Sequence, residues 1–392
     1  MAPLTFRHVA KRILTAVNGL EAHKRYTAVI HPDYQVQVSD ETEAPAWDAF
    51  VARSPGGHHV QTNLWARVKS TLGWRTKRIT ITRDEKIIAG AQILFRPLPF
   101  VGAVGHVSRG PLVTGDDPLA ADLIINKLKE VARRNRIQLL SVQPPAQGEM
   151  MAGRLRHFGF LPSVINIGQP TATVLIDLTA DFDTILAGMK KATRKHIRRG
   201  MRAGITVREG LDSDLDTFYD LLVATSQRQN FSTYPKAYFY EMWRLFRPAG
   251  YVRLFVAEYR DEPVSAHWVI PFGDTLISKL AGWSGNHGKL RPNEVLEWEV
   301  IRWAKHQNLR YYDLEGIDPE AARLLVQGQP LPDRFQNTPT SYKLRFGGQV
   351  ALFPGAYDYL YNPLFRWGYR LVLARIIRSS LVKHVLNRLR TR

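Results

Sequence analysis

The sequence predicts a protein of the α+β or α/β class with mixed central sheets, in which one folding module occurs twice. Three observations lead to this prediction: a length of 392 residues, a β-hairpin pattern that occurs twice, and a proline-started helix after each hairpin. A chain of this length is too long for one ordinary core, and about two domains are expected. The apolar fraction of 45% and the charged fraction of 23% are those of a globular protein.

Two segments repeat the same hairpin pattern. Residues 78–96 and residues 254–270 each contain a β-branched or aromatic run, a charged turn and a second apolar run. The turns read Arg83-Asp-Glu and Arg260-Asp-Glu, which are 177 positions apart. Two apolar runs joined by a short charged turn predict a β-hairpin.

A helical pattern that begins with proline follows each hairpin, and an apolar strand follows each helix. The helices are predicted over residues 118–134 and 292–307, and the strands over residues 137–142 and 309–314. Proline suits the first helical turn because its missing N–H would have no partner there. Recurrence at nearly the same offset as the hairpins favours an internal duplication over an ordinary alternation of helices and strands.

The order hairpin, helix and strand resembles the acetyltransferase (GNAT) fold, so we predict two fused GNAT-like domains. We expect them at residues 35–168 and 170–355. A basic amphipathic segment at 1–30 precedes them, and a basic amphipathic helix at 356–392 follows them. The resemblance implies a donor held where two central strands splay apart.

The glycine-rich turn that such folds use for the coenzyme A pyrophosphate is incomplete. The corresponding places read Gly102-Ala-Val-Gly105 and Gly285-Asn-His-Gly288. A lone Gly-x-x-Gly pattern is a weak signal, and we expect plain surface turns. The sequence therefore favours a donor other than an acyl-coenzyme A.

The net charge of +19 is concentrated in three segments. Residues 1–26 carry +4, residues 188–208 carry +8 and residues 357–392 carry +7, so the remainder is neutral. Concentrated positive charge of this kind indicates docking surfaces for phosphates or anionic lipid.

The middle basic segment, residues 188–208, predicts an amphipathic helix without any acidic residue. At helical spacing its cations form two adjacent stripes whose like charges repel one another, which a bound polyanion would explain. A solvated face is the alternative. The candidate polyanion-binding residues are Lys190, Arg194, Arg198 and Arg202 on one stripe, and Lys191, Lys195 and Arg199 on the other.

The C-terminal segment alternates apolar and basic residues from Pro363 to Arg392. This pattern is typical of a helix lying in an anionic membrane interface, and a terminal helix packed on the domain is the alternative. No apolar run approaches the roughly 20 residues that span a bilayer, and we expect no secretory signal. The predicted location is cytoplasmic and peripheral, at an anionic membrane surface.

Several classes of chemistry are excluded or disfavoured by the residues present. The chain has no Cys, which excludes disulfides, thiolate catalysis and cysteine-ligated metal. It contains no zinc-type histidine pairing, no Gly-x-Ser-x-Gly elbow and no P-loop. We therefore expect no metal and no nucleotide cofactor, and a transferase that positions an already activated donor against an amine.

From about Gln61 to Tyr359 the chain resembles the Fem family of peptidoglycan bridge-forming aminoacyltransferases, in the compact form without a coiled-coil arm. The resemblance depends on seven local motifs in order. They are Gln61-Thr-Asn-Leu-Trp-Ala-Arg-Val-Lys69, Arg109-Gly-Pro-Leu112, Thr173-Val-Leu-Ile-Asp-Leu178, Lys191-Ala-Thr-Arg-Lys-His-Ile-Arg-Arg-Gly200, Pro292-Asn-Glu-Val-Leu-Glu-Trp-Glu299, Tyr312-Asp-Leu-Glu-Gly-Ile317 and Tyr342-Lys-Leu-Arg-Phe-Gly-Gly348.

The resemblance implies non-ribosomal peptide-bond formation, in which aminoacyl-tRNA donates an amino acid to a muramyl-peptide precursor such as lipid II. It implies that Lys69 contacts acceptor phosphate and that Tyr238 belongs to the acceptor site, to which the positions of Gln143 and Tyr234 also belong. It implies that Lys343, after Tyr342, lies near the tRNA acceptor end and takes part in transfer, so both are candidate catalytic residues. It also makes the cations of residues 190–202 candidates for binding tRNA and predicts a location at the inner face of a bacterial plasma membrane. Asp313 is a candidate to assist proton loss from the amine.

Three positions depart from the family pattern on the acceptor side. Gln143 stands where acceptor-binding members have Asp before Pro, Tyr234 stands where they have Arg before Pro, and Leu280 replaces a tyrosine. The acceptor is therefore left open between a lipid-linked or UDP-linked precursor and an amine outside the cell wall. Acyl-coenzyme A-dependent N-acyl transfer is a second hypothesis, and a non-enzymatic RNA- or membrane-binding protein is a third.

Overall fold

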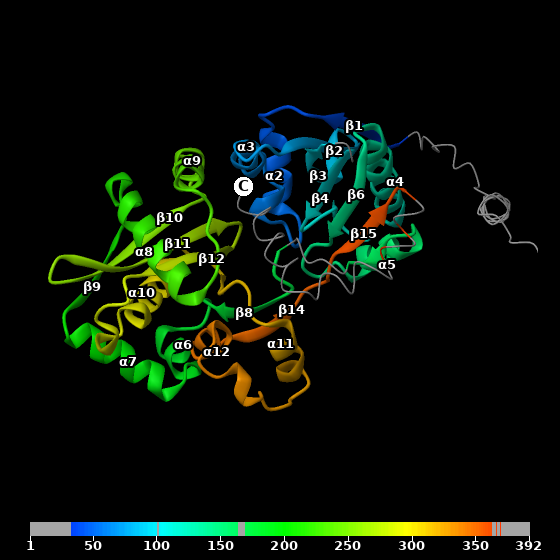
Figure 1. Cartoon of the computed structure of the whole chain (residues 1–392). Coiled ribbons are helices and arrows are strands. Elements are labelled where there is room, and N and C mark those ends of the chain that lie inside the picture. The colour runs from blue at the N-terminus through cyan, green and yellow to red at the C-terminus, as the bar shows by residue number, and fades with distance from the viewer. Residues whose placement is uncertain (1–32, 100–101, 164–168, 363–365, 367–368, 370–392) are drawn as a thin grey trace, which may run out of the picture. The chain divides into compact units, whose positions relative to one another are not determined.

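A computed structural model describes residues 33–99, 102–163, 169–362, 366 and 369, and the structural statements below concern these residues (Figure 1). The predicted N-terminal segment and nearly all of the predicted C-terminal helix lie outside the described residues.

The first sheet has the strand order β1-β2-β3-β4-β6-β15-β7, with β5 paired to β3. All its pairings with a stated register are antiparallel except β4 with β6, which is parallel, so the sheet is mixed. Its strands are β1 (Gln35–Ser39), β2 (Arg75–Arg83), β3 (Lys86–Leu98), β4 (Gly102–Ser108), β5 (Leu112–Val113), β6 (Ile137–Gln143), β7 (Leu161–Pro162) and β15 (Tyr357–Leu360). The helices of this module are α2 (Pro45–Arg53), α3 (Asn63–Ser70), α4 (Pro118–Arg134) and α5 (Glu149–His157).

The second sheet has the order β14-β8-β13-β12-β11-β10-β9 and again one parallel pair, β12 with β13. Its strands are β8 (Ala172–Asp177), β9 (Ile205–Glu209), β10 (Arg253–Tyr259), β11 (Glu262–Phe272), β12 (Thr275–Trp283), β13 (Tyr311–Asp313) and β14 (Gln349–Leu352). The helices are α6 (Phe182–Gly188), α7 (Lys191–Arg202), α8 (Leu215–Gln229), α9 (Lys236–Phe246), α10 (Pro292–His306), α11 (Pro319–Val326) and α12 (Pro339–Leu344). The predicted class, two GNAT-like modules with mixed sheets, is confirmed.

The two predicted hairpins, β2–β3 and β10–β11, share their fine geometry. Each turn places two non-glycine residues at positive φ, Asp84 and Glu85 in the first and Arg260 and Asp261 in the second. Each ladder also has a register shift just before the turn, after Ile81 in the first and after Ala257 in the second. By backbone conformation Asp84 is therefore equivalent to Arg260, whereas the sequence triplets align Arg83 with Arg260. The structural alignment of the two hairpins differs from the sequence alignment by one residue, because the conformation of the turn sets the strand register.

Three sequence-based assignments need correction. The basic helix predicted over 188–208 is α7 alone, because Gly204 at φ +88° ends it and β9 follows. The pattern from Gly102 to Gly105 lies in strand β4 and is not a turn, whereas Gly285 to Gly288 is a loop. Residues 357–360, assigned to the terminal helix, form β15 between β6 and β7, so the chain returns to the first sheet after β14.

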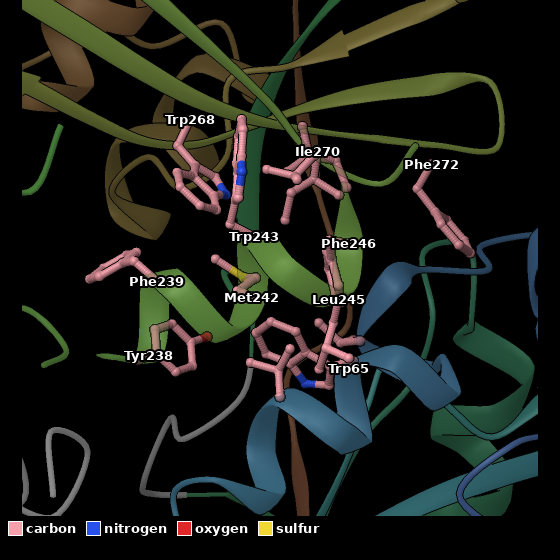
Figure 2. Packing of buried hydrophobic residues seen from close by; sticks show 14 of the residues in the cluster. Trp65, Tyr238, Phe239, Met242, Trp243, Leu245, Phe246, Trp268, Ile270 and Phe272 are labelled. Carbon is pink, nitrogen blue, oxygen red and sulfur yellow. The ribbon is translucent and has the colours of Figure 1, made fainter. Parts of the chain in front are cut away.

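One hydrophobic cluster runs from the second sheet into the first module. Successive residues of β10 alternate between two clusters, with Leu254 in this one and Phe255 in the other, because neighbouring side chains of a strand point to opposite faces. Figure 2 shows side chains of α9 between Trp268 on β11 and Trp65 on α3. The apolar face of α9 therefore packs on both modules and helps to position the site described below.

A glycine tests how tightly α7 packs. A Cβ atom added at Gly200 would lie 2.4 Å from Val295 Cγ2 and 2.6 Å from the Leu290 carbonyl oxygen, whereas one added at Gly153, in α5, would meet nothing within 4 Å. We expect Gly200→Ala to lower the free energy of unfolding by about 1–3 kcal/mol through overpacking. Gly153→Ala should raise it by up to about 1 kcal/mol, since alanine favours helix. Denaturant unfolding measures both, and equal effects would contradict the packing.

Candidate active site

The two parallel strands at the centre of the second sheet, β12 and β13, are hydrogen-bonded to each other over only a short stretch. β12 pairs with β13 only from Thr275 to Ile277, where Ile277 faces Asp313, although β12 continues to Trp283. In the first sheet, the parallel strands β4 and β6 stay paired along nearly all of β4. Since the GNAT fold holds its donor where central strands part, the end of the β12–β13 ladder is the candidate reaction site.

An ion pair joins the two chain segments just beyond this ladder. Lys279 is the extra residue of a β-bulge, because the β11 ladder skips it between Ser278 and Leu280. Its ammonium lies 2.7 Å from the carboxylate of Glu315. The two side chains are 18% and 14% exposed, so water screens the pair only in part.

Lys343 lies on α12, and its ammonium is held by backbone carbonyls. It donates to the Gly316 oxygen at 2.9 Å and also to the Glu315 oxygen. Burial lowers the pKa of Lys343, and the Glu315 carboxylate opposes this shift. The preceding Tyr342 packs on Phe346, and burial raises the pKa of its hydroxyl well above the ordinary value.

Asp313 is engaged at the end of β13. Its Oδ1 accepts hydrogen bonds from the Thr173 hydroxyl and from the Glu315 backbone N–H, the latter at 2.7 Å. Burial raises the pKa of this carboxyl group, and these hydrogen bonds oppose the shift. The contacts fix the chain between Asp313 and Glu315, and we call Asp313, Glu315, Gly316 and Lys343 the strand-end group.

Lys69 on α3 lies in an aromatic cage, which we define as Lys69 with Trp65, Tyr234 and Tyr238. Its Nζ lies 5.0, 4.7 and 5.3 Å from the three ring centroids in that order. It donates to the Tyr234 hydroxyl at 3.3 Å, and the two tyrosine rings stack with centroids 4.3 Å apart. The side chain forms no ion pair with a described carboxylate, and burial lowers the pKa of Lys69. A mostly buried ammonium with this environment suits an incoming anion.

Gln143 and Arg109 hold the chain where it passes between the sheets. The Gln143 amide donates to the Gln169 carbonyl at 2.9 Å and accepts from its N–H at 2.7 Å, so both polar ends are used. Arg109 donates to the Pro170 carbonyl at 2.8 Å and lies over the Phe353 ring. Its Nε and Nη1 have no hydrogen-bond partner among the described residues, and burial lowers its pKa to about 10.

Glu315 of the strand-end group pairs with Lys279, and both charges act on residues of the cage. Burial is the main cause that lowers the pKa of Lys69, and Tyr234 opposes it. The charge of Lys279 lowers this pKa further, as a smaller effect. After burial and Tyr234, Glu315 contributes to raising the pKa of Tyr238. The pair therefore lies within electrostatic range of Lys69 and Tyr238 in the cage. The sequence motif Tyr312–Ile317 contains Glu315 but did not single it out, and Lys279 was not predicted. The one sequence feature near Lys279 was its neighbour Leu280, which departs from the family pattern.

Six of the seven candidate tRNA-binding cations lie on the exposed side of α7 or at its start. Arg194 instead turns inward, donating to the Ala187 carbonyl at 3.1 Å and to two neighbouring carbonyls, and it thereby caps the end of α6. None of the other six forms an ion pair within the described ranges. They are Lys190, Lys191, Lys195, Arg198, Arg199 and Arg202.

Two kinds of feature are absent from the part of the chain that the structure describes. No cluster of three or more His, Asp or Glu side chains is arranged to hold a metal ion. No helix in the same part combines the length and the apolar character needed to cross a membrane.

Two family models match separate parts of the chain. The FemAB family matches residues 42–158, and an acetyltransferase (GNAT) domain matches residues 188–322. A lipid II:glycine glycyltransferase of Staphylococcus aureus strain MRSA252 is 27% identical over 289 residues, which is 70% of this chain and 68% of that protein. Its Staphylococcus saprophyticus counterpart is 26% identical over 56% of this chain, and the match spans only 55% of that protein.

Solved structures agree on the fold. The crystal structure of FemX has a TM-score of 0.73 at 19% identity and covers 84% of this chain and 99% of that one. The structure of L-PGS from Bacillus licheniformis has a TM-score of 0.54 at 13% identity over 91% of this chain and 99% of that one. The fold is thus that of two fused GNAT modules. The match of residues 42–158 to the FemAB family model agrees with the resemblance found in the sequence.

His106, on β4, gives the stability of the protein a pH dependence that can be measured. Burial lowers its pKa to about 4, and the Lys69 charge adds to the shift. The neutral ring is therefore favoured in the folded state, and its contribution to stability is full above the usual pKa of 6.5 and is lost as the pH falls towards 4. This shift is worth at most about 3 kcal/mol.

We expect His106→Gln to reduce the fall in the free energy of unfolding between pH 7 and pH 4. Part of the fall should remain, because burial also lowers the pKa of His58, His59 and His267. Denaturant unfolding at several pH values measures the difference between variant and wild type. Parallel curves for the two proteins would contradict a neutral His106 in the folded state.

Proposed function

We propose that the chain transfers an amino acid from aminoacyl-tRNA to an amine on the peptide of a peptidoglycan precursor, as in interpeptide bridge formation. The observation that carries the proposal is the cage around Lys69, which lies within electrostatic range of the Lys279–Glu315 pair. Lys343 holds the backbone of the same Glu315. The match of residues 42–158 to the FemAB family model and the relatives named lipid II:glycine glycyltransferase support it.

The cage is proposed to receive the acceptor. Desolvating the Lys69 ammonium without a carboxylate partner is costly, and a bound phosphate or pyrophosphate would offset this cost. Tyr234 takes part in the cage by stacking and hydrogen bonding. Gln143 would act indirectly, since its amide already holds Gln169. Lipid II is the favoured acceptor because the relatives are named for it, and peripheral contact with an anionic membrane is part of the proposal.

The strand-end group is proposed to receive the donor ester. Catalysis would consist of positioning and electrostatic stabilisation, with Asp313 and Tyr342 shaping the segment that Lys343 holds, and no metal or nucleotide would be needed. The exposed cations of α7 are proposed to bind tRNA phosphates. The GNAT match favours acyl-coenzyme A as a second candidate donor, although the described chain lacks the complete glycine-rich pyrophosphate turn.

One assay distinguishes these donors. Purified protein is incubated with lipid II and a mixture of charged tRNAs, or with lipid II and acetyl-coenzyme A, and the lipid-linked peptide is analysed by mass spectrometry. We expect the mass of one or more amino acids to be added in the first reaction. Acetylation in the second reaction, with no product in the first, would contradict the proposal.

The role of α7 predicts a change in salt dependence. The logarithm of the tRNA association constant falls as the logarithm of the salt concentration rises, and each lost phosphate contact should make this slope less steep by about 0.7–0.9. The combined variant Lys191→Ala, Lys195→Ala and Arg198→Ala should therefore reduce the steepness by about 2. Fluorescence anisotropy with labelled tRNA measures the slope. A control triple variant removes three ion-paired cations and should leave the slope nearly unchanged: Lys127→Ala, Arg154→Ala and Arg302→Ala. Equal slopes for both triples would contradict the role of α7.

A further inference from the structure

Aminoacyl transfer to an amine needs two charges at one place. The attacking nitrogen must lose a proton as the amide bond forms, and the ester carbonyl oxygen becomes negative in the transition state. A proton acceptor and a cation must therefore lie between the acceptor side and the donor side.

The two side chains first suggested by sequence are already engaged. The Oδ1 atom of Asp313 accepts from Thr173 and from the Glu315 backbone, so this carboxylate serves the local fold. The Lys343 ammonium donates to the carbonyl oxygens of Glu315 and Gly316. Both residues thereby fix the segment that presents the Glu315 side chain.

The Lys279–Glu315 pair is the remaining combination of base and cation at this point. The Glu315 carboxylate has Lys279 as its one hydrogen-bonding partner among the described residues, and its side chain is 14% exposed. The ladder register puts Lys279 outside the regular pairing of β12. The left-handed backbone of Glu315, at φ +38°, is held by the Lys343 contact. Local geometry thus presents both charges beyond the last β12–β13 pair.

We propose that the Lys279–Glu315 pair is where the acceptor amine and the donor ester react. Glu315 holds the amine and accepts its proton, and Lys279 stabilises the negative charge that develops on the carbonyl oxygen. The assignment depends on the proposed function and adds its proton acceptor and its cation.

The bonds and protons balance in this step. The amine nitrogen forms a bond to the ester carbonyl carbon, and the bond from that carbon to the 3′ or 2′ oxygen of the terminal ribose breaks. The proton passes from the nitrogen to the Glu315 carboxylate and then to the departing ribose oxygen. The products are an amide and a free tRNA hydroxyl group, with Glu315 returned to its ionised form.

A comparison of two nucleophiles tests Glu315. Glu315→Gln keeps the shape of the side chain and removes its basicity, so kcat/KM with lipid II should fall by about a hundredfold or more. Hydroxylamine is uncharged at neutral pH and attacks esters without a base. With hydroxylamine as acceptor, after subtraction of the uncatalysed reaction, the variant should keep within about threefold of the wild-type rate.

Lys279→Met tests the cation by the same comparison. Charge stabilisation of the carbonyl oxygen serves both nucleophiles, so we expect losses of about a hundredfold or more with lipid II and with hydroxylamine alike. Glu299→Gln is the matched control for the Glu315 variant, because Glu299 pairs with Arg302 on α10. It should leave both rates unchanged, and thermal unfolding of each variant reports loss of structure separately.

The outcomes separate the two proposals. Two results with an active wild type would contradict the role of Glu315 and leave the proposed function intact. In one, Glu315→Gln loses the same factor of rate with lipid II and with hydroxylamine. In the other, it loses less than about threefold in kcat/KM with lipid II. A Lys279→Met variant with both rates near wild type contradicts the role of the cation. A wild-type protein that transfers nothing to either nucleophile from any charged tRNA contradicts the proposed function, and the assignment with it.

Discussion

The chain passes between its two sheets twice, and two buried side chains of the first module hold both crossings. Gln143 binds both backbone polar groups of Gln169, and Arg109 binds the Pro170 carbonyl while its guanidinium covers the Phe353 ring. Leaving such a buried group without its partner costs about 1–3 kcal/mol, so these contacts are strong constraints on the backbone. The cage combines Lys69 and Trp65 of the first module with Tyr234 and Tyr238 of the second, so it forms only because the modules joined at these crossings meet.

The site places three buried or half-buried cations near few carboxylates. Lys69 has aromatic rings and a phenol hydroxyl as neighbours, Lys343 has carbonyl oxygens, and Lys279 has Glu315. Desolvation lowers the pKa of Lys69 and Lys343, which is the cost of holding positive charge away from water. A substrate that carries phosphate and develops an oxyanion would relieve this cost in the bound state, and the function proposed here follows from that balance.

Strong local signals made much of the fold predictable from the sequence. Proline-started α4 and α10 and the two hairpins lie where the pattern put them, and family motifs pointed to Lys69 and Lys343. The Lys279–Glu315 pair could not be predicted, because its members are 36 residues apart and meet only through the strand order of the second sheet. The inward turn of Arg194 was equally hidden, since helical spacing alone gives no information about carbonyl groups at the end of α6.

The central claim is that acceptor and donor meet between the cage and the strand-end group. The most direct measurement is a crystal structure of the protein with a stable conjugate that joins an acceptor peptide and its phosphate to the terminal adenosine of tRNA. We predict that the phosphate lies at Lys69 and that the linking atoms lie beside Lys279 and Glu315. A conjugate bound elsewhere, for example in the cavity of about 630 Å³ lined by Arg75 and Arg136, would contradict the account.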